Sequence, residues 1–357
     1  MHKPFNDNPA ANADRIVLLS MGLGRDSMAM LCQLLDGELL VEGRRCGPAD
    51  IDAVVFSDPG AEWDFTYDLI PVVRALCEAH GLRFLVLAKP PREAWEARVA
   101  QGKGVKGAPA WTKELADASV EAKAAGGYYH LRAPIMADYM RTGRITVRAS
   151  AGCTDNHKIR VINGRLLDDL SRERFGLGNR SWGAQVRKGE RRPHVVLIGY
   201  AADETSRLSS EDAKAQARSF LTPRYPLIEA GITKADEAAI LKRHGLNHVR
   251  KSGCMMCHYQ PDAWFWALRE TRPQVFAQVV AYERHAASTN PKMRIRHKTR
   301  FINEVVELWR ARHPDATVDA VLNKGYDREC ERPAAKTPAL LTIEEPRQAP
   351  VQLSLFA

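Results

Sequence analysis

Short apolar runs alternate with segments of helical periodicity along the first quarter of the chain. Residues 15–20 are mainly apolar, a glycine-rich turn follows, and apolar side chains then recur at helical spacing over residues 27–35. The pattern repeats with an apolar run at residues 51–56, a helix predicted over residues 67–80 and a third run at residues 83–87. Strands that alternate with helices are typical of an α/β fold, so we predict a doubly wound parallel sheet.

The rest of the chain continues this pattern and then becomes helical. Residues 90–148 carry few strand signals, which indicates an excursion from the sheet, and a further buried-strand run follows at residues 194–199. Residues 233–236 have the spacing of a capping box, and helical patterns cover residues 264–280 and 301–312. We therefore expect a mainly helical subdomain after the sheet.

The composition is that of a soluble globular protein. The chain has 357 residues, of which 45% are hydrophobic and 27% are charged, so it can bury a large core. No segment has the apolar length needed to cross a bilayer, and the N-terminus lacks the apolar centre of a secretory signal. We expect a cytoplasmic protein without a membrane partner, in which the seven cysteines are free thiols, metal ligands or redox groups.

The net charge agrees with a polyanionic partner without establishing one. A formal net charge of +9 would attract nucleic acid, although a thinly spread excess would only keep the protein soluble. Two local runs of basic residues, at 187–192 and 291–300, favour the nucleic acid. Both interpretations stay open at this point.

The turn between the first strand and the first helix has the chemistry of a phosphate-binding loop. Backbone N–H groups at a helix N-terminus form an anion site, and two glycines let the backbone approach a phosphate closely. Two serines add hydroxyl donors and an arginine adds a positive charge. The spacing fits neither the Walker loop nor the G-x-G-x-x-G pattern, and a merely structural turn is the alternative. The candidate nucleotide-binding residues are Ser20, Gly22, Gly24, Arg25, Asp26 and Ser27.

Four motifs resemble those of one enzyme family and occur in the same order. Residues 24–27 are similar to the second half of the SGGxDS loop of the ATP-pyrophosphatase (PP-loop) superfamily. Residues 56–63 resemble the F-x-D-T-G-x-E segment of its phosphosulfate reductase branch, residues 153–160 the Cys-x-x-x-x-Lys segment, and residues 225–228 with 253–257 the C-terminal part. The chain thus resembles the phosphoadenosine-phosphosulfate (PAPS) reductase family. The resemblance implies an adenine nucleotide alpha hydrolase-like fold that binds ATP.

The loop also departs from the pattern of this family. Gly22 stands where the family usually has serine, Leu23 where it has glycine, and Arg25 where lysine is common. Ser20 is a candidate to replace the missing hydroxyl. The loop therefore predicts phosphate binding more firmly than it predicts the reaction that follows.

Charged residues in these motifs are candidates for catalysis. Asp58 and Glu62 offer the oxygen ligands that suit Mg²⁺ between ATP oxygens, although acids that cap a helix N-terminus would look the same. Lys158 and Arg160 would face phosphate or sulfate oxygens, or form a solvated basic face. The candidate catalytic residues are Asp26, Asp58, Glu62, Lys158 and Arg160.

Asp203 and Arg207 are further candidates for nucleotide binding. They follow the buried run at residues 194–199, and ligands of open α/β sheets gather beyond the carboxyl ends of the strands. An ion-paired surface turn is the alternative.

Cys254 and Cys257 form a CxxC pair, which can bind zinc, hold an iron–sulfur cluster or cycle as a dithiol. In the iron–sulfur branch of the PAPS reductase family, two cysteines at the position of Cys153 join such a pair to bind a [4Fe–4S] cluster. Cys153 is alone here, so the resemblance implies three thiolate ligands and one iron that is open to bind and deliver sulfide. A zinc ion completed by His157 or His258, or three unligated thiols, are the alternatives.

The C-terminal tail resembles a docking segment. Residues 329–350 are polar and rich in proline, which indicates a flexible linker. Residues Gln352–Phe356 resemble the QLxLF peptide by which bacterial DNA polymerases and repair factors bind the replicative sliding clamp. The alternative is an apolar end that folds back onto its own domain.

These interpretations combine into one hypothesis. We expect a PP-loop nucleotide-binding α/β domain at residues 1–230, a helical subdomain with the CxxC pair at 231–328, the linker at 329–350 and the clamp-docking peptide at 351–357. The expected function is ATP-dependent adenylylation of nucleic acid, with DNA favoured, followed by sulfur transfer. It would use ATP, Mg²⁺ and a [4Fe–4S] cluster, with Zn²⁺ as the alternative metal and a cysteine desulfurase as a candidate sulfur donor. The alternatives are a reductase of phosphoadenylyl or adenylyl sulfate and a non-catalytic, nucleotide-sensing DNA-associated protein.

Overall fold

The computed structural model describes residues 14–88, 152–207, 218–297 and 299–324, together with residues 135, 143 and 145. The predicted linker, the clamp-like peptide and most of the predicted excursion lie outside these residues. None of the described helices is both long and apolar enough to cross a membrane.

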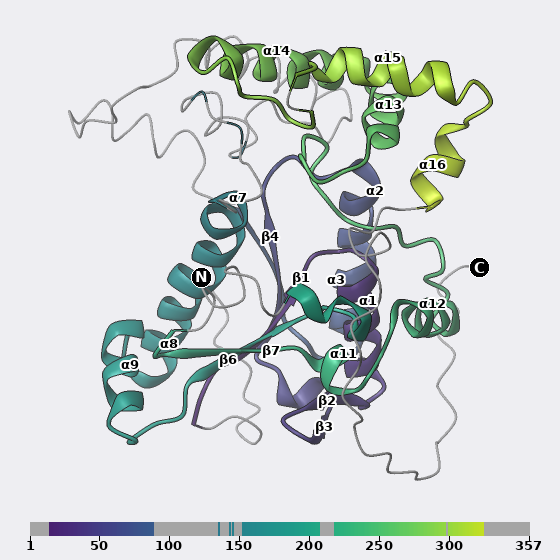
Figure 1. Ribbon diagram of the computed structural model, residues 1–357. Coiled ribbons are helices and arrows are strands. Elements are labelled where there is room, and N and C mark those ends of the chain that lie inside the picture. The colour runs from purple at the N-terminus through teal and green to yellow at the C-terminus, as the bar shows by residue number, and fades with distance from the viewer. Residues whose placement is uncertain are drawn as a thin grey trace.

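A sheet of five parallel strands forms the centre of the protein (Figure 1). The strands are β1 (Val17–Met21), β4 (Ala53–Asp58), β5 (Phe84–Ala88), β6 (His194–Ile198) and β7 (Leu221–Arg224). Their order in the sheet is β5-β4-β1-β6-β7. The central strands are nearly continuous apolar runs because both faces of the sheet are covered. The prediction of an α/β fold with a parallel sheet is confirmed.

Helices α1 (Arg25–Leu35), α3 (Leu69–Ala79) and α12 (Lys234–Arg243) cover one face of the sheet. Leu19 and Leu197 contribute to the apolar core beneath these helices. Because side chains alternate between the two faces along a strand, the neighbouring residues of the same strands serve the opposite face.

That opposite face is covered by η2 (Asp155–Leu166) and α8 (Leu167–Phe175), against which Leu18 and Val196 pack. η2 is a π-helix, a form that is rare and frequently marks functional sites. α8 ends at Gly176, whose φ of 70° is a left-handed conformation that glycine adopts without strain. Helices therefore flank the sheet on both faces.

A second apolar core lies among four helices near the C-terminal end of the described chain, at the top of Figure 1. Trp63, from the loop after β4, enters this core and packs edge-on against Trp264, with the ring centroids 5.4 Å apart. The loop after β4 therefore joins the second core to the sheet. The four helices are α13 (Asp262–Thr271), α14 (Pro273–Thr289), α15 (Ile302–Arg312) and α16 (Val318–Lys324).

The structure divides two segments that the sequence pattern predicted as single helices. Residues 264–280 belong to α13 and α14, because Pro273 lacks an N–H and begins a new helix. The pattern at residues 67–80 begins in α2 (Asp64–Tyr67) and continues in α3. In both places the apolar periodicity continues across the break, so periodicity alone does not reveal it.

Thr233 caps α12 as predicted. Its N–H donates to the carboxylate of Asp236 (2.9 Å), and its hydroxyl oxygen accepts from the N–H of Asp236 (3.4 Å). The remaining elements are short. They are β2 (Leu39–Val41), β3 (Arg44–Cys46), α7 (Gly152–Thr154), α9 (Asn179–Arg187), α11 (Pro226–Glu229), η1 (Pro48–Asp50) and η3 (Ala202–Arg207).

His194, at the start of β6, is a buried polar residue that ties several elements together. Its Nδ1 accepts a hydrogen bond from the N–H of Ile16 (3.0 Å), and its Nε2 lies 3.2 Å from the hydroxyl of Ser171. Its ring stacks on Trp182. Burial, and then the nearby guanidinium groups, lower the pKa of His194 to about 3. The histidine is therefore neutral in the folded protein at neutral pH.

This buried neutral histidine predicts a sensitivity to acid. The unfolded chain binds a proton at His194 near pH 6.5 and the folded chain only near pH 3, so stability is complete above this window and is lost as the pH falls through it. The free energy of unfolding should fall by up to about 1.4 kcal/mol per pH unit because of this residue. The free energy of unfolding, measured by denaturant titration at several pH values between about 5 and 7, should depend less steeply on pH for His194→Gln than for the wild type. An equal pH dependence in the two proteins would contradict the assignment of a buried neutral histidine.

Candidate functional site

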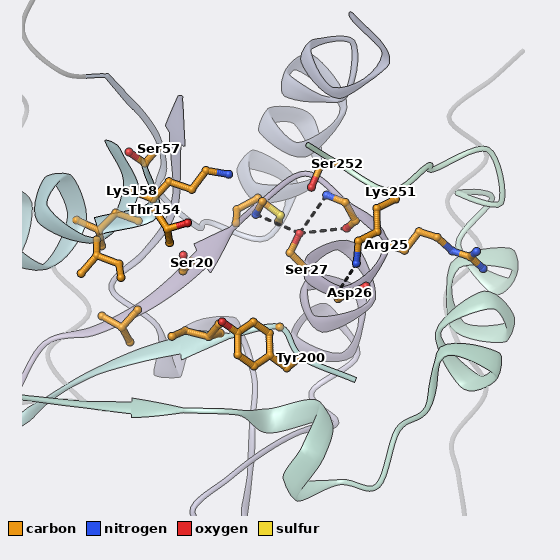
Figure 2. Close-up of a pocket in the computed structure, with 18 of the residues that line it drawn as sticks. Ser20, Arg25, Asp26, Ser27, Ser57, Thr154, Lys158, Tyr200, Lys251 and Ser252 are labelled. Atoms are coloured by element: carbon orange, nitrogen blue, oxygen red, sulfur yellow. Dashed lines mark hydrogen bonds and ion pairs between the residues drawn. The ribbon is translucent and has the colours of Figure 1, made fainter. Parts of the chain in front are cut away.

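A cavity of about 270 Å³ opens at the carboxyl ends of β1, β4 and β6. The chain runs outward from β1 through β4 to β5 and then returns to β6 on the other side of β1, so the connections diverge between β1 and β6. Ligands of open α/β sheets bind at such a point. The cavity is lined by the predicted phosphate loop, by η2, by the end of β6 and by Lys251 and Ser252 (Figure 2).

Ser27 closes the predicted phosphate loop on itself. Its hydroxyl donates to the carbonyl of Gly24 (3.0 Å) and accepts from the N–H groups of Gly22 (3.1 Å) and Gly24 (3.3 Å). These bonds fix the turn at the N-terminus of α1, where the N–H groups of the first helical turn have no partner within the helix and can bind a phosphate oxygen. The structure brings together the loop residues that the sequence singled out, since the following all line the cavity: Ser20, Gly22, Gly24, Arg25, Asp26 and Ser27.

Two departures from the family loop have a structural description. Leu23 has a φ of 56°, a left-handed conformation that costs a non-glycine residue about 1–2 kcal/mol. Its side chain is buried in the core beneath α1, and burial of a leucine contributes about 1.5–3 kcal/mol, which offsets that cost. Arg25 touches the cavity, but Figure 2 shows its guanidinium extending away from Ser27.

The predicted phosphate loop packs closely against two other parts of the backbone, at Ser252 and at Gly199. A Cβ on Gly24 would lie 2.5 Å from Oγ and 2.9 Å from the backbone nitrogen of Ser252. A Cβ on Gly199, just after β6, would lie 3.0 Å from the backbone of Asp26 and Ser27. Both positions therefore require glycine, because backbone atoms occupy the space that a side chain would need.

Lys251 brings a positive charge to the loop from a distant part of the sequence. Its Nζ lies 3.9 Å from the carboxylate of Asp26 (Figure 2) and 3.8 Å from that of Glu204. Lys234 also pairs with Glu204, at 3.0 Å. Burial, and then the charges of Asp26 and Glu204, raise the pKa of Glu237 to about 9, so this carboxyl is protonated at neutral pH. The ion pairs of Lys234 and Lys251 thus form a network that includes Asp26 of the predicted phosphate loop.

Asp203 and Arg207 lie in η3, the short helix after β6. Asp203 is exposed and is not among the cavity-lining residues. Its neighbour Glu204 is buried and belongs to the network around Lys251. The side chain of Arg207 is outside the described part of the structure. The turn after β6 thus reaches the site through Glu204.

Lys158, on η2, lies between the cavity and the thiols of Cys153 and Cys254. It lines the cavity, and its Nζ lies 3.1 Å from Oε1 of Glu62, whose side chain is fully buried. Burial acts to lower the pKa of Lys158, but Glu62, followed by the thiols of Cys254 and Cys153, raises it above its ordinary value. Lys158 therefore remains protonated and connects the cavity with the thiols.

Asp58 and Glu62, the predicted Mg²⁺ ligands, have protein partners in this structure. Asp58 Oδ1 accepts from the hydroxyl of Tyr67 (2.8 Å) and from the N–H of Gly60 (2.6 Å). The Tyr67 oxygen accepts in turn from the N–H of Glu62 (3.3 Å), so these bonds shape the loop after β4. Neither carboxylate lines the cavity, and among the described lining residues Asp26 alone carries one.

Arg160 lies on η2 but away from the cavity. Its side chain is 70% exposed and pairs with Asp155 at 2.7 Å. Conversely, Tyr200, Lys251 and Ser252 line the cavity although the sequence analysis did not select them. The available signal was the position of Lys251 and Ser252 directly before the CxxC motif.

Three thiols lie beside the Lys158–Glu62 pair. Cys254 forms a β-bridge with Glu62, and its Sγ lies 3.9 Å from Oε1 of that residue. Burial, and then Glu62, raise the pKa of the Cys254 thiol; Lys158 opposes them, and Cys257 and Cys153 are close enough to raise it further. Within the described part of the chain, none of these three cysteines forms a disulfide, and all three residues are partly exposed. The structure therefore brings together the three cysteines that the sequence selected.

The three thiols are metal-binding groups by their chemistry. Among the described residues, no group of three or more His, Cys, Asp and Glu side chains has the geometry to hold a metal ion. Cysteine thiolates are ligands of both structural zinc sites and iron–sulfur clusters, so the three cysteines fit either of the two metals considered from the sequence.

Comparison of the chain with models of protein families, with curated proteins and with solved structures gives no significant match. The likeness to the PAPS reductase family therefore rests on the motifs alone. The chemistry of the site has to be inferred from its own geometry.

The close approach of Ser252 predicts that the two loop glycines differ in their tolerance of a side chain. Gly24→Ala should lower the free energy of unfolding by about 1–3 kcal/mol, because its Cβ would overlap the Ser252 backbone. Gly22→Ala is the matched control, since its Cβ would lie 3.5 Å from Ser252 Oγ, an ordinary contact. Chemical denaturation of both variants measures the difference. Equal losses would contradict the packing described.

Proposed function

We propose that this chain is an ATP-dependent enzyme of the PP-loop, PAPS reductase type, with an adenine nucleotide alpha hydrolase-like fold. It adenylylates an oxygen atom of nucleic acid and then replaces that oxygen with sulfur. The observation that carries the proposal is the position of Lys158, which lines the cavity and also lies within the electrostatic reach of two thiols. A nucleotide and a sulfur-bearing group would thus act on the same substrate atom.

The walls of the cavity supply the features that ATP needs. The N–H groups at the start of α1 would bind phosphate oxygens, with Lys158 and Lys251 as the nearby cations. Apolar side chains of η2 and β6, among them Ile162 and Val196, line the same cavity and would contact the adenine ring. Asp26 would meet the Mg²⁺ that accompanies the triphosphate.

The reaction proceeds in two displacements. An oxygen atom of the substrate attacks the α-phosphorus of ATP, the bond to the β-phosphate oxygen breaks, and pyrophosphate leaves. Hydrosulfide then attacks the substrate atom that bears the adenylyl group, a bond to sulfur forms, and AMP leaves with the oxygen. Lys158 and Lys251 offset the negative charge that develops in the first step.

The three cysteines provide for the second displacement. A [4Fe–4S] cluster held by Cys153, Cys254 and Cys257 would have one iron without a protein thiolate and could supply sulfide there. A cysteine desulfurase is the candidate source of the sulfur, together with a dithiol reductant that supplies the two electrons needed to convert its persulfide sulfur to hydrosulfide. The clamp-like peptide at Gln352–Phe356 would bring the enzyme to replicating or repaired DNA, which favours DNA as the substrate.

Substitutions in the Lys158–Glu62 pair should separate the contribution of Lys158 to stability from its contribution to catalysis. Lys158→Met leaves Glu62 buried without its cation, and should cost about 2 kcal/mol of stability, less than a fully buried pair because the lysine side chain is 37% exposed. Lys158→Met combined with Glu62→Gln removes both charges and should recover most of the stability. Pyrophosphate release should remain about 100-fold below wild type in both variants. Recovery of activity in the double variant would reduce Lys158 to a structural role.

Pyrophosphate and metal analyses test the proposed function directly. Protein purified without oxygen should contain iron and acid-labile sulfide, and should release pyrophosphate and AMP from ATP when DNA or RNA is added. Colourless, iron-free protein with stoichiometric zinc would remove the sulfur-transfer step. Thioredoxin-dependent release of sulfite from phosphoadenylyl sulfate would assign a reductase activity instead, and absence of pyrophosphate under all conditions would leave a nucleotide sensor.

A further inference from the structure

The two basic runs in the sequence differ in their acidic partners. In the run at residues 187–192, Lys188 lies 3.8 Å from Glu190, and Arg192 lies 3.2 Å from Glu42. Arg187 and Arg191 of the same run bond to the uncharged side chains of Ser219 and Gln185, so acidic neighbours offset part of its charge.

The second run belongs to a longer stretch that contains no acidic residue. Between Glu283 and Glu304 the sequence has six arginines and lysines and no aspartate or glutamate. We call residues 284–300 the basic segment. Its Arg284, Lys292 and Arg300 are exposed and form no ion pair with any other described residue. These charges therefore remain available to an anionic partner.

The basic segment is fixed to the second core by a buried carboxylate. Glu283 on α14 is fully buried, and its two oxygens accept from the N–H groups of Ile295 (2.7 Å) and Ile302 (2.5 Å). Both isoleucine side chains are buried in the second core. Arg294 stacks over the ring of Phe301 at 3.8 Å. The described part of the segment is thus held in one conformation, so little conformational entropy is lost when it binds a partner.

The basic segment also borders the three thiols. Arg296 donates to the carbonyl of His258 (3.2 Å), the residue that follows Cys257, and to the carboxylate of Asp262 (3.1 Å). On the preceding helix, Tyr282 belongs to the second core, against which Cys153 and Cys254 pack. Figure 1 shows α14 and α15, which the segment connects, together at one end of the molecule.

We infer that the basic segment binds the sugar–phosphate backbone of the nucleic-acid substrate and directs it toward the thiols. The inference deepens the proposed function, on which the nature of the reaction rests. Exposed arginines and lysines that neutralise phosphates release condensed counterions, and binding then weakens steeply with salt. A preformed cationic surface beside the sulfur-transfer group would bring a long, uniformly charged substrate to a site that recognises only one atom of it.

Direct binding measurements test this surface without requiring catalysis. The probe is a fluorescein-labelled DNA duplex of mixed sequence, with single-stranded DNA and RNA of the same sequence in parallel, and fluorescence anisotropy is measured with the full chain. Lys292→Glu combined with Arg300→Glu should weaken binding at least about tenfold at low salt. It should also reduce the slope of log K against log salt concentration by about 1.8 for the duplex, which corresponds to two lost phosphate contacts.

A second pair of charge reversals controls for net charge. Arg180→Glu on α9 combined with Lys188→Glu directly after this helix changes the total charge by the same amount, and should weaken binding much less. Equal weakening by both pairs would overturn the inference, as would unchanged binding in the first pair. Displacement of the duplex by polyglutamate as readily as by unlabelled DNA would assign the surface to an acidic protein and would also overturn it. The binding assay contains no ATP and is therefore independent of catalysis. Binding that depends on the basic segment, in a protein that releases no pyrophosphate in the separate activity assay, would count against the proposed function but would support the binding surface.

Discussion

The ion pair between Lys158 and the buried Glu62 is the contact on which the rest of the site depends. A carboxylate removed from water is costly unless a cation meets it, so Glu62 constrains where η2 can lie relative to the loop after β4. Cys254 bridges to the same glutamate through its backbone. Three segments from distant parts of the sequence therefore meet at one charge. Because Lys158 also lines the cavity, this one ion pair connects the wall of the cavity with the thiols.

Besides the loop after β4, residues 251–255 also connect the predicted phosphate loop with the second apolar core. Lys251 joins the network behind the loop, Ser252 lies against Gly24, and Cys254 lies against Glu62. Met255 then enters the second core, and its N–H donates to the carbonyl of Ala61 (2.9 Å), so the segment is fixed at both ends. Close-packed interiors transmit strain, so a displacement of Ser252 at one end of this segment would also displace Met255 at the other.

Much of the fold could be predicted because its signals are local. Apolar runs gave the positions of β1, β4, β5 and β6, and the capping box gave the start of α12. The short strand β7 lacked a comparable signal, and the apolar periodicity that continues across Pro273 masked the break that this proline introduces. In the site, the glycines, Ser27 and the three cysteines belong to motifs and were selected. Lys251 and Glu237 were not, because their roles arise from contacts with Asp26, more than 200 positions away in sequence.

Contacts between residues that are distant in sequence also explain how the altered loop can keep its proposed role. Leu23 retains the left-handed conformation that a glycine would adopt, because burial of its side chain offsets the conformational cost. Arg25 stands where a lysine is common but turns its guanidinium away from Ser27. The cation beside Asp26 is supplied by Lys251 instead. The cation beside the loop therefore comes from a segment more than 200 positions away, and the loop sequence taken alone does not reveal it.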